Sequence, residues 1–130
     1  MAEPGCTARI STLGMLELQS ALAGKVRAGQ LPEAAAEAHV SRALLDISTG
    51  DLRVSAVTAR HYLDAGRLVA RFGFAHRLRS LDALQLAVAL DLQSQGLVDF
   101  VVVADKTAEQ VGRLAGLRII NPQSIAEIGG

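Results

Sequence analysis

The sequence predicts an α/β protein with a parallel sheet flanked by helices, and three observations lead to this class. Residues 101–103 are consecutive valines, and such a β-branched run is typical of a strand buried on both faces, as in a parallel sheet. A helical pattern and a short apolar run follow, so residues 98–120 are predicted to form a strand–helix–strand unit with parallel strands. The length of 130 residues fits a single domain, residues 1–130, with most helices ahead of this unit.

The first part of the chain is predicted to be mainly helical. Residues 1–11 are expected to be irregular, because a Pro–Gly pair near the start breaks regular structure. Apolar residues at three- and four-residue steps predict a helix from residue 11 or 12 to about 28. A second helix is expected from residue 32 or 33 to about 45, and residues 52–57 alternate well enough for a short strand or an extended link.

The second part of the chain contains the strongest patterns. A third helix is predicted over residues 58–72, and Ser80 opens a fourth that continues to about residue 95. A strand over residues 98–104, a helix over 107–114 and a strand over 117–120 complete the chain. The expected inward residues of the third helix are Tyr62, Ala65, Val69 and Phe72.

Composition excludes several classes of protein. Half of the residues are hydrophobic and the mean hydropathy is +0.30, which argues against disorder. No apolar run approaches the roughly 20 residues of a membrane span, and the start of the chain lacks the apolar stretch of a secretory signal. Cys6 is the single cysteine and cannot form an intrachain disulfide. We therefore expect a cytoplasmic protein that does not enter a membrane.

Charge is balanced, with 13 basic and 13 acidic residues, which excludes a strongly basic nucleic-acid-binding coat. A local basic patch is still allowed, and the guanidinium fork of arginine suits phosphate. The same arginines could instead lie on solvated helix faces. The arginines concentrated in one stretch are Arg53, Arg60, Arg67, Arg71, Arg77 and Arg79.

Three acids stand out by position: Glu17, Asp82 and Asp105. Asp105 follows the predicted buried strand, and ligands of open α/β sheets gather at the carboxyl ends of strands. Asp82 lies in the first turn of a helix of roughly 20 Å, and the strand returns over roughly 23 Å. These two acids can therefore reach the same edge of the sheet. Glu17 lies between two leucines and must face a rim or a shared polar pocket, because burying an unpaired charge is unfavourable.

Clustered carboxylates repel one another, and a divalent cation relieves that repulsion. Hard oxygen ligands without a nearby His or Cys select Mg²⁺, with Mn²⁺ as a second possibility. Each acid also has a structural alternative, because Asp82 suits the first turn of a helix and Asp105 suits a helix N-cap. For the three histidines, surface or helix-lining roles are expected: His39, His61 and His76.

Three segments resemble signature stretches of PIN-domain proteins, especially VapC-type toxins. They are residues 78–87 (LRSLDALQLA), 99–106 (DFVVVADK) and 117–122 (LRIINP). Residues 10–30, which contain Glu17, resemble the segment of that family that bears its second acid. The resemblance covers roughly residues 10–122.

The resemblance implies a PIN-like three-layer fold and a Mg²⁺-dependent endoribonuclease, the toxin component of a type II toxin–antitoxin system. It implies hydrolysis of RNA phosphodiesters by a metal-activated water, a homodimer and a cognate antitoxin. Glu17, Asp82 and Asp105 match the second, third and fourth acids of the family's quartet and would be both catalytic and metal-binding residues. Arg79 could contact RNA phosphate or pair with an acid.

The chain departs from the family at its start. The family begins with a central strand that ends in the first acid, and no such strand is expected here, since Glu3 lies in a Pro–Gly context. Val103 stands where the family often has Ser or Thr. One alternative is therefore a truncated, catalytically weak or inactive PIN-fold binding module that retains antitoxin binding or self-association. Another is an unrelated small α/β regulator in which the acids only cap helices.

Overall fold

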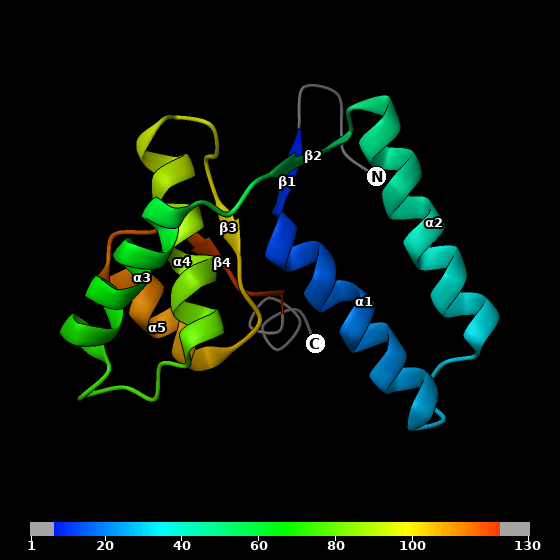
Figure 1. Ribbon diagram of the computed structural model, residues 1–130, viewed down its shortest axis with the longest axis horizontal. Coiled ribbons are helices and arrows are strands. Elements are labelled where there is room, and N and C mark those ends of the chain that lie inside the picture. The colour runs from blue at the N-terminus through cyan, green and yellow to red at the C-terminus, as the bar shows by residue number, and fades with distance from the viewer. Residues whose placement is uncertain (1–6, 123–130) are drawn as a thin grey trace. The chain divides into compact units, whose positions relative to one another are not determined.

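The computed structural model describes residues 7–122. The chain forms two compact units, which divide in the sequence between Val57 and Thr58. Within the described residues, each unit combines helices with a two-stranded parallel sheet (Figure 1). The predicted α/β class is confirmed at this coarse level. The single-domain organisation and the PIN-like three-layer arrangement stay predictions.

The first unit contains a parallel pair of strands, β1 (Ala8–Ser11) and β2 (Leu52–Ser55), matched residue for residue. Parallel neighbours need a long crossover connection, which α1 (Thr12–Arg27) and α2 (Glu33–Thr49) supply (Figure 1). The prediction that all of residues 1–11 are irregular is therefore wrong for β1. Its four residues carry little local signal, and pairing with β2 holds them extended.

Local bonds set the ends of the helices in the first unit. The Ser11 side chain accepts a hydrogen bond of 2.8 Å from the backbone N–H of Gly14, which caps α1. α2 continues past its predicted end near residue 45, and the Ser48 hydroxyl donates to the Leu45 carbonyl within this last turn. Gly50 then ends α2 with φ +86°, in the left-handed region that favours glycine.

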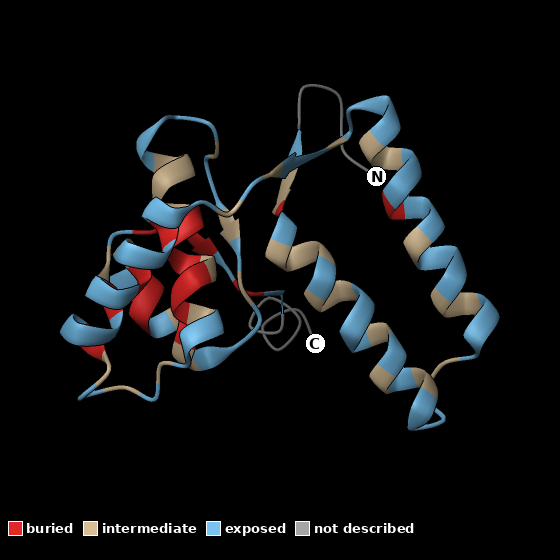
Figure 2. Cartoon of the chain, viewed as in Figure 1, coloured by how far each residue is buried: buried red, intermediate tan, exposed pale blue. Residues whose placement is uncertain are grey.

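The helices of the first unit bury few side chains (Figure 2). No residue of α1 is buried, and α2 buries Ala43. Leu16, Leu44 and Leu45 are exposed on these helices. The apolar residues that predicted the two helices are therefore mostly half-buried or exposed in the described part of this unit.

The core of the described chain lies in the second unit, where α3 (Ala59–Phe72), α4 (Ser80–Ser94) and α5 (Lys106–Leu114) carry most buried residues (Figure 2). Val111 of α5 is fully buried. Burial of aliphatic side chains stabilises this unit by about 1.5–3 kcal/mol for each large one. The buried apolar residues are Ala65, Leu68, Phe72, Ala83, Leu84, Leu86, Ala87, Val88, Ala108, Val111, Leu117 and Ile119.

The buried face of α3 differs from the predicted one. Ala65 and Phe72 are buried as expected, but Tyr62 is 64% exposed and Val69 is also exposed. Leu68 and His61 are buried instead. The apolar spacing fits two overlapping stripes on this helix, and tertiary packing selects one of them.

The strand–helix–strand unit is confirmed, with β3 (Val101–Val102) and β4 (Ile119–Ile120) parallel and α5 between them. The strands are shorter than predicted, and Val102 is 68% exposed, so the expectation of a strand buried on both faces is wrong. Within the described residues β3 pairs only with β4. A strand in a two-stranded sheet has one neighbouring strand and is therefore less covered than a strand in the middle of a larger sheet.

Within residues 7–122, no helix combines the length and the apolar character needed to cross a membrane.

Candidate functional site

Asp82 lies in the first turn of α4, as the sequence predicted. Arg79 is the extended N-cap residue of this helix, with φ −78° and ψ 155°. Its guanidinium Nε donates to Oδ2 of Asp82 at 3.2 Å. The Asp82 side chain is 22% exposed, and the unpaired N–H groups at a helix N-terminus favour a carboxylate there.

Asp105 is the N-cap residue of α5, immediately after the segment that contains β3. Its Oδ2 accepts a hydrogen bond of 2.8 Å from the backbone N–H of Ala108. Capping by Asp105, one of the two structural alternatives, is therefore present. It uses one carboxylate oxygen, and Oδ1 accepts no hydrogen bond within the part of the chain that the structure describes.

The chain direction brings the starts of α4 and α5 to the same end of the second unit. In the view of Figure 1, α4 runs toward one end, and the chain returns through β3 to the start of α5 at the other. This is the arrangement predicted from the lengths of the helix and the strand. It places the helix turns that bear Asp82 and Asp105 at one end of the second unit.

Glu17 lies in α1 and is half-buried. It belongs to the first unit, whereas Asp82 and Asp105 belong to the second, so the convergence of all three acids stays a prediction. Among residues 7–122 no group of three or more His, Cys, Asp or Glu side chains is arranged to hold a metal ion. The oxygen donors of Asp82 and Asp105 are of the kind that Mg²⁺ prefers, since it is commonly bound through one or two carboxylates and several waters.

A network of hydrogen bonds around Asn121 and Glu109 positions the segment between β3 and α5. Asn121, which is buried, donates through Nδ2 to Oε1 of Glu109 at 3.0 Å and to the Ala104 carbonyl at 3.4 Å. Arg113 donates to Oε2 of Glu109 at 3.0 Å. The hydrogen bond from Asn121, followed by that from Arg113, lowers the pKa of Glu109 below its ordinary value. Asn121 thus ties the end of β4 to the residue before Asp105.

A buried histidine connects α3 to α4, and this pair has no sequence signal because its members lie on different helices. His61 is 5% exposed, and its Nδ1 accepts a hydrogen bond of 2.9 Å from the backbone N–H of Thr58. Its Nε2 therefore carries the proton and donates to Oδ2 of Asp91 at 2.7 Å. This bond, together with one from Gln95, lowers the pKa of Asp91. Since both ring nitrogens are engaged, His61 positions the helices and has no free nitrogen for a metal or a substrate.

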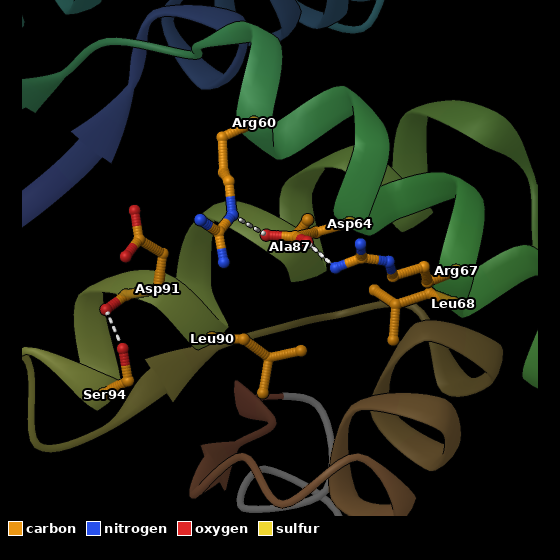
Figure 3. A pocket seen from close by; sticks show the side chains of 8 residues that line it. All are labelled: Arg60, Asp64, Arg67, Leu68, Ala87, Leu90, Asp91 and Ser94. Atoms are coloured by element: carbon orange, nitrogen blue, oxygen red, sulfur yellow. Dashed lines mark hydrogen bonds and ion pairs between the residues drawn. The ribbon is translucent and has the colours of Figure 1, made fainter.

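A groove of about 470 Å³ lies between α3 and α4 (Figure 3). Arg60 and Arg67 both reach Asp64, with Arg60 Nε 3.6 Å and Arg67 Nη1 3.1 Å from its carboxylate oxygens. The two lining arginines are balanced by two lining aspartates, so the groove has no net charge to attract an anion. The groove is lined by Arg60, Asp64, Arg67, Leu68, Ala87, Leu90, Asp91 and Ser94.

No protein-family model, curated protein or solved structure matches this chain. The resemblance to PIN domains and VapC-type toxins therefore stays a prediction, which rests on the residues of the chain. The structural feature most relevant to this resemblance is the pair of acids, Asp82 and Asp105, at the starts of α4 and α5.

Proposed function

We propose that the chain is a Mg²⁺-dependent endoribonuclease with a PIN-like three-layer fold, the toxin component of a type II toxin–antitoxin system. The observation that supports this most directly is the position of Asp82 and Asp105 at the starts of two helices that begin at the same end of the second unit. Ligands of α/β folds gather beyond the carboxyl ends of parallel strands, which is where Asp105 lies.

Asp82 and Asp105 would hold the cation, which is Mg²⁺ or Mn²⁺. A bound cation of this kind stabilises charge on the phosphate and lowers the pKa of a coordinated water. The backbone N–H groups at the start of α4 favour an RNA phosphate nearby, and the exposed guanidinium of Arg79 is able to bind it. Asn121 keeps the Asp105 turn in place through the Ala104 carbonyl.

The partners in this proposal are RNA, a cognate antitoxin and a second copy of the chain, in the cytoplasm. The exposed leucines of α1 and α2 support an interaction with another protein chain: Leu16, Leu44 and Leu45. Apolar side chains left accessible on adjoining helices are common where proteins associate.

A second candidate function is a PIN-fold binding module with weak or no activity. Both acids already have structural roles that favour this function: Asp105 caps α5, and Asp82 pairs with Arg79. Such a module would retain antitoxin binding or self-association without cleaving RNA.

RNA cleavage in Mg²⁺ and in EDTA separates the two functions. For the enzyme we expect Mg²⁺-dependent cleavage, with a loss of about 100-fold or more in Asp82→Asn and Asp105→Asn, since several kcal/mol of charge stabilisation are removed. Asp64→Asn is the matched control, because this acid lies on α3 and pairs with Arg60 and Arg67. Circular dichroism checks that each variant is folded.

Equal cleavage by Asp82→Asn and the parent would reject the role of Asp82. A folded parent that cleaves no RNA in Mg²⁺ or Mn²⁺, but binds a partner chain, would establish the binding module instead.

A further inference from the structure

We propose that Arg79 occupies the place of a cation on Asp82 in the metal-free protein and is displaced when a divalent cation binds. This inference rests on the proposed function, because it concerns the same carboxylate. It gives Arg79 a role in controlling the occupancy of the site, beyond contact with RNA.

The ion pair between Arg79 and Asp82 is built so that it can open. It consists of one bond, from Nε to Oδ2 at 3.2 Å, and the guanidinium Nη groups make no hydrogen bond within residues 7–122. The Arg79 side chain is 74% exposed. An ion pair with this exposure is weak, so a divalent charge on the carboxylate competes with it successfully.

Asp82 itself stays in place when Arg79 leaves. It lies in the first turn of α4, where backbone N–H groups favour its negative charge, and it is largely covered by the protein. Oδ1 accepts no hydrogen bond within the described residues. One oxygen is thus open to a cation, while the other is paired with an exposed side chain.

Arg113, in the same unit, has a structural role and serves as a comparison for Arg79. It contacts Glu109 through Nη2 at 3.0 Å and through Nε at 3.4 Å, and its Nη2 also donates to the Ile119 carbonyl at 3.1 Å. Arg113 thereby links α5 to β4. Arg79 makes no hydrogen bond to the backbone of another helix or strand in the described chain, so its departure from Asp82 disturbs no other element there.

The exchange couples metal binding to substrate binding. A cation bound to the Asp82 carboxylate would release the guanidinium of Arg79 next to the site, with all of its donors available for a phosphate. Without a cation, the same group is turned onto Asp82 and binds phosphate less well. The chain would then engage RNA productively only after the metal is bound.

Mn²⁺ binding to the full chain without RNA tests this inference. Free Mn²⁺ is measured by electron paramagnetic resonance for the parent, Arg79→Ala and Arg77→Ala. Arg77 is a matched control, because it is exposed, lies two residues earlier and makes no ion pair within residues 7–122. We expect Arg79→Ala to bind Mn²⁺ about two- to fivefold more tightly than the parent, and Arg77→Ala to match the parent.

A second measurement follows Arg79 itself. In ¹⁵N-labelled parent protein, the Nε–H resonance that is absent from Arg79→Ala should move toward the position of free arginine when Mg²⁺ is added. Equal Mn²⁺ affinity in all three proteins, or an Nε–H resonance that ignores Mg²⁺ while Mn²⁺ binds, would overturn the inference and leave the proposed function standing. Absence of Mn²⁺ binding in the parent and in Arg79→Ala would reject both.

Discussion

At the scale of single residues, two carboxylates outside the candidate metal site, Asp91 and Glu109, have lowered pKa values. Asp91 accepts a hydrogen bond from Nε2–H of His61, and Glu109 accepts hydrogen bonds from Asn121 and Arg113. In both cases donors facing the ionised carboxylate lower its pKa. The Asp91 carboxylate links α3 to α4, and the Glu109 carboxylate links α5 to Asn121 at the end of β4.

The His61–Asp91 hydrogen bond should be measurable as stability. Asp91→Ala leaves the buried Nε2–H of His61 without its acceptor, so we expect the free energy of unfolding to fall by about 1–2 kcal/mol. Asp64→Ala removes a carboxylate from exposed pairs only and should change stability by about 1 kcal/mol or less. Urea denaturation at neutral pH makes the comparison, and equal losses in the two variants would contradict it.

The lowered pKa values predict the pH dependence of stability. Both folded-state values lie below the ordinary ones, 3.8 for Asp91 and 4.5 for Glu109, so the unfolded chain binds more protons in the acid range. The stabilisation is present above the ordinary values and is lost as pH falls through the lowered ones. The stability difference between the parent and Asp91→Asn should therefore shrink below about pH 3.8. A difference that stays constant down to pH 2.5 in urea denaturation would be inconsistent with this assignment.

At the scale of elements, two glycines of the second unit illustrate how packing decides the effect of one methyl group. Gly112 lies in α5, where a Cβ would come within 2.5 Å of Ile119 Cδ1 and 3.2 Å of Leu86 Cδ2. Gly66 lies in α3, where a Cβ would meet no atom within 4 Å. The glycine in α5 therefore permits close packing of three elements, whereas the one in α3 only weakens its helix.

Alanine at these two positions should act in opposite directions. Gly112→Ala forces neighbouring side chains to shift and should lower the free energy of unfolding by about 1–3 kcal/mol. Gly66→Ala removes backbone freedom from the unfolded chain and should raise it by about 0.5–1 kcal/mol. Thermal denaturation of the two variants beside the parent tests the pair. Destabilisation by Gly66→Ala would indicate that this face of α3 is covered in solution.

At the scale of the whole molecule, the two units differ in how much they bury. α4 has five buried residues and α1 has none. Local opening requires less free energy where few apolar contacts must break. The described part of the first unit should therefore be the less stable one unless another chain covers it.

Hydrogen exchange measures this difference directly. Amides in the middle of α1 should exchange at least about tenfold faster than those in the middle of α4, for an opening difference above about 1.4 kcal/mol. Protection of α1 that rises with protein concentration would indicate self-association through the first unit. Equal protection of α1 and α4 in dilute protein would show that burial in the single chain does not set their stabilities.

The sequence by itself determined most helices, the strand–helix–strand unit and the places of Asp82 and Asp105 at helix starts. These features depend on local periodicity, caps and glycine stops, which a few neighbouring residues specify. Only the tertiary structure decided that residues 8–11 form a strand, that Val102 is exposed and that His61 meets Asp91. The pairing of β1 with β2, the exposure of Val102 and the contact of His61 with Asp91 depend on residues far along the chain, and no local pattern encodes them.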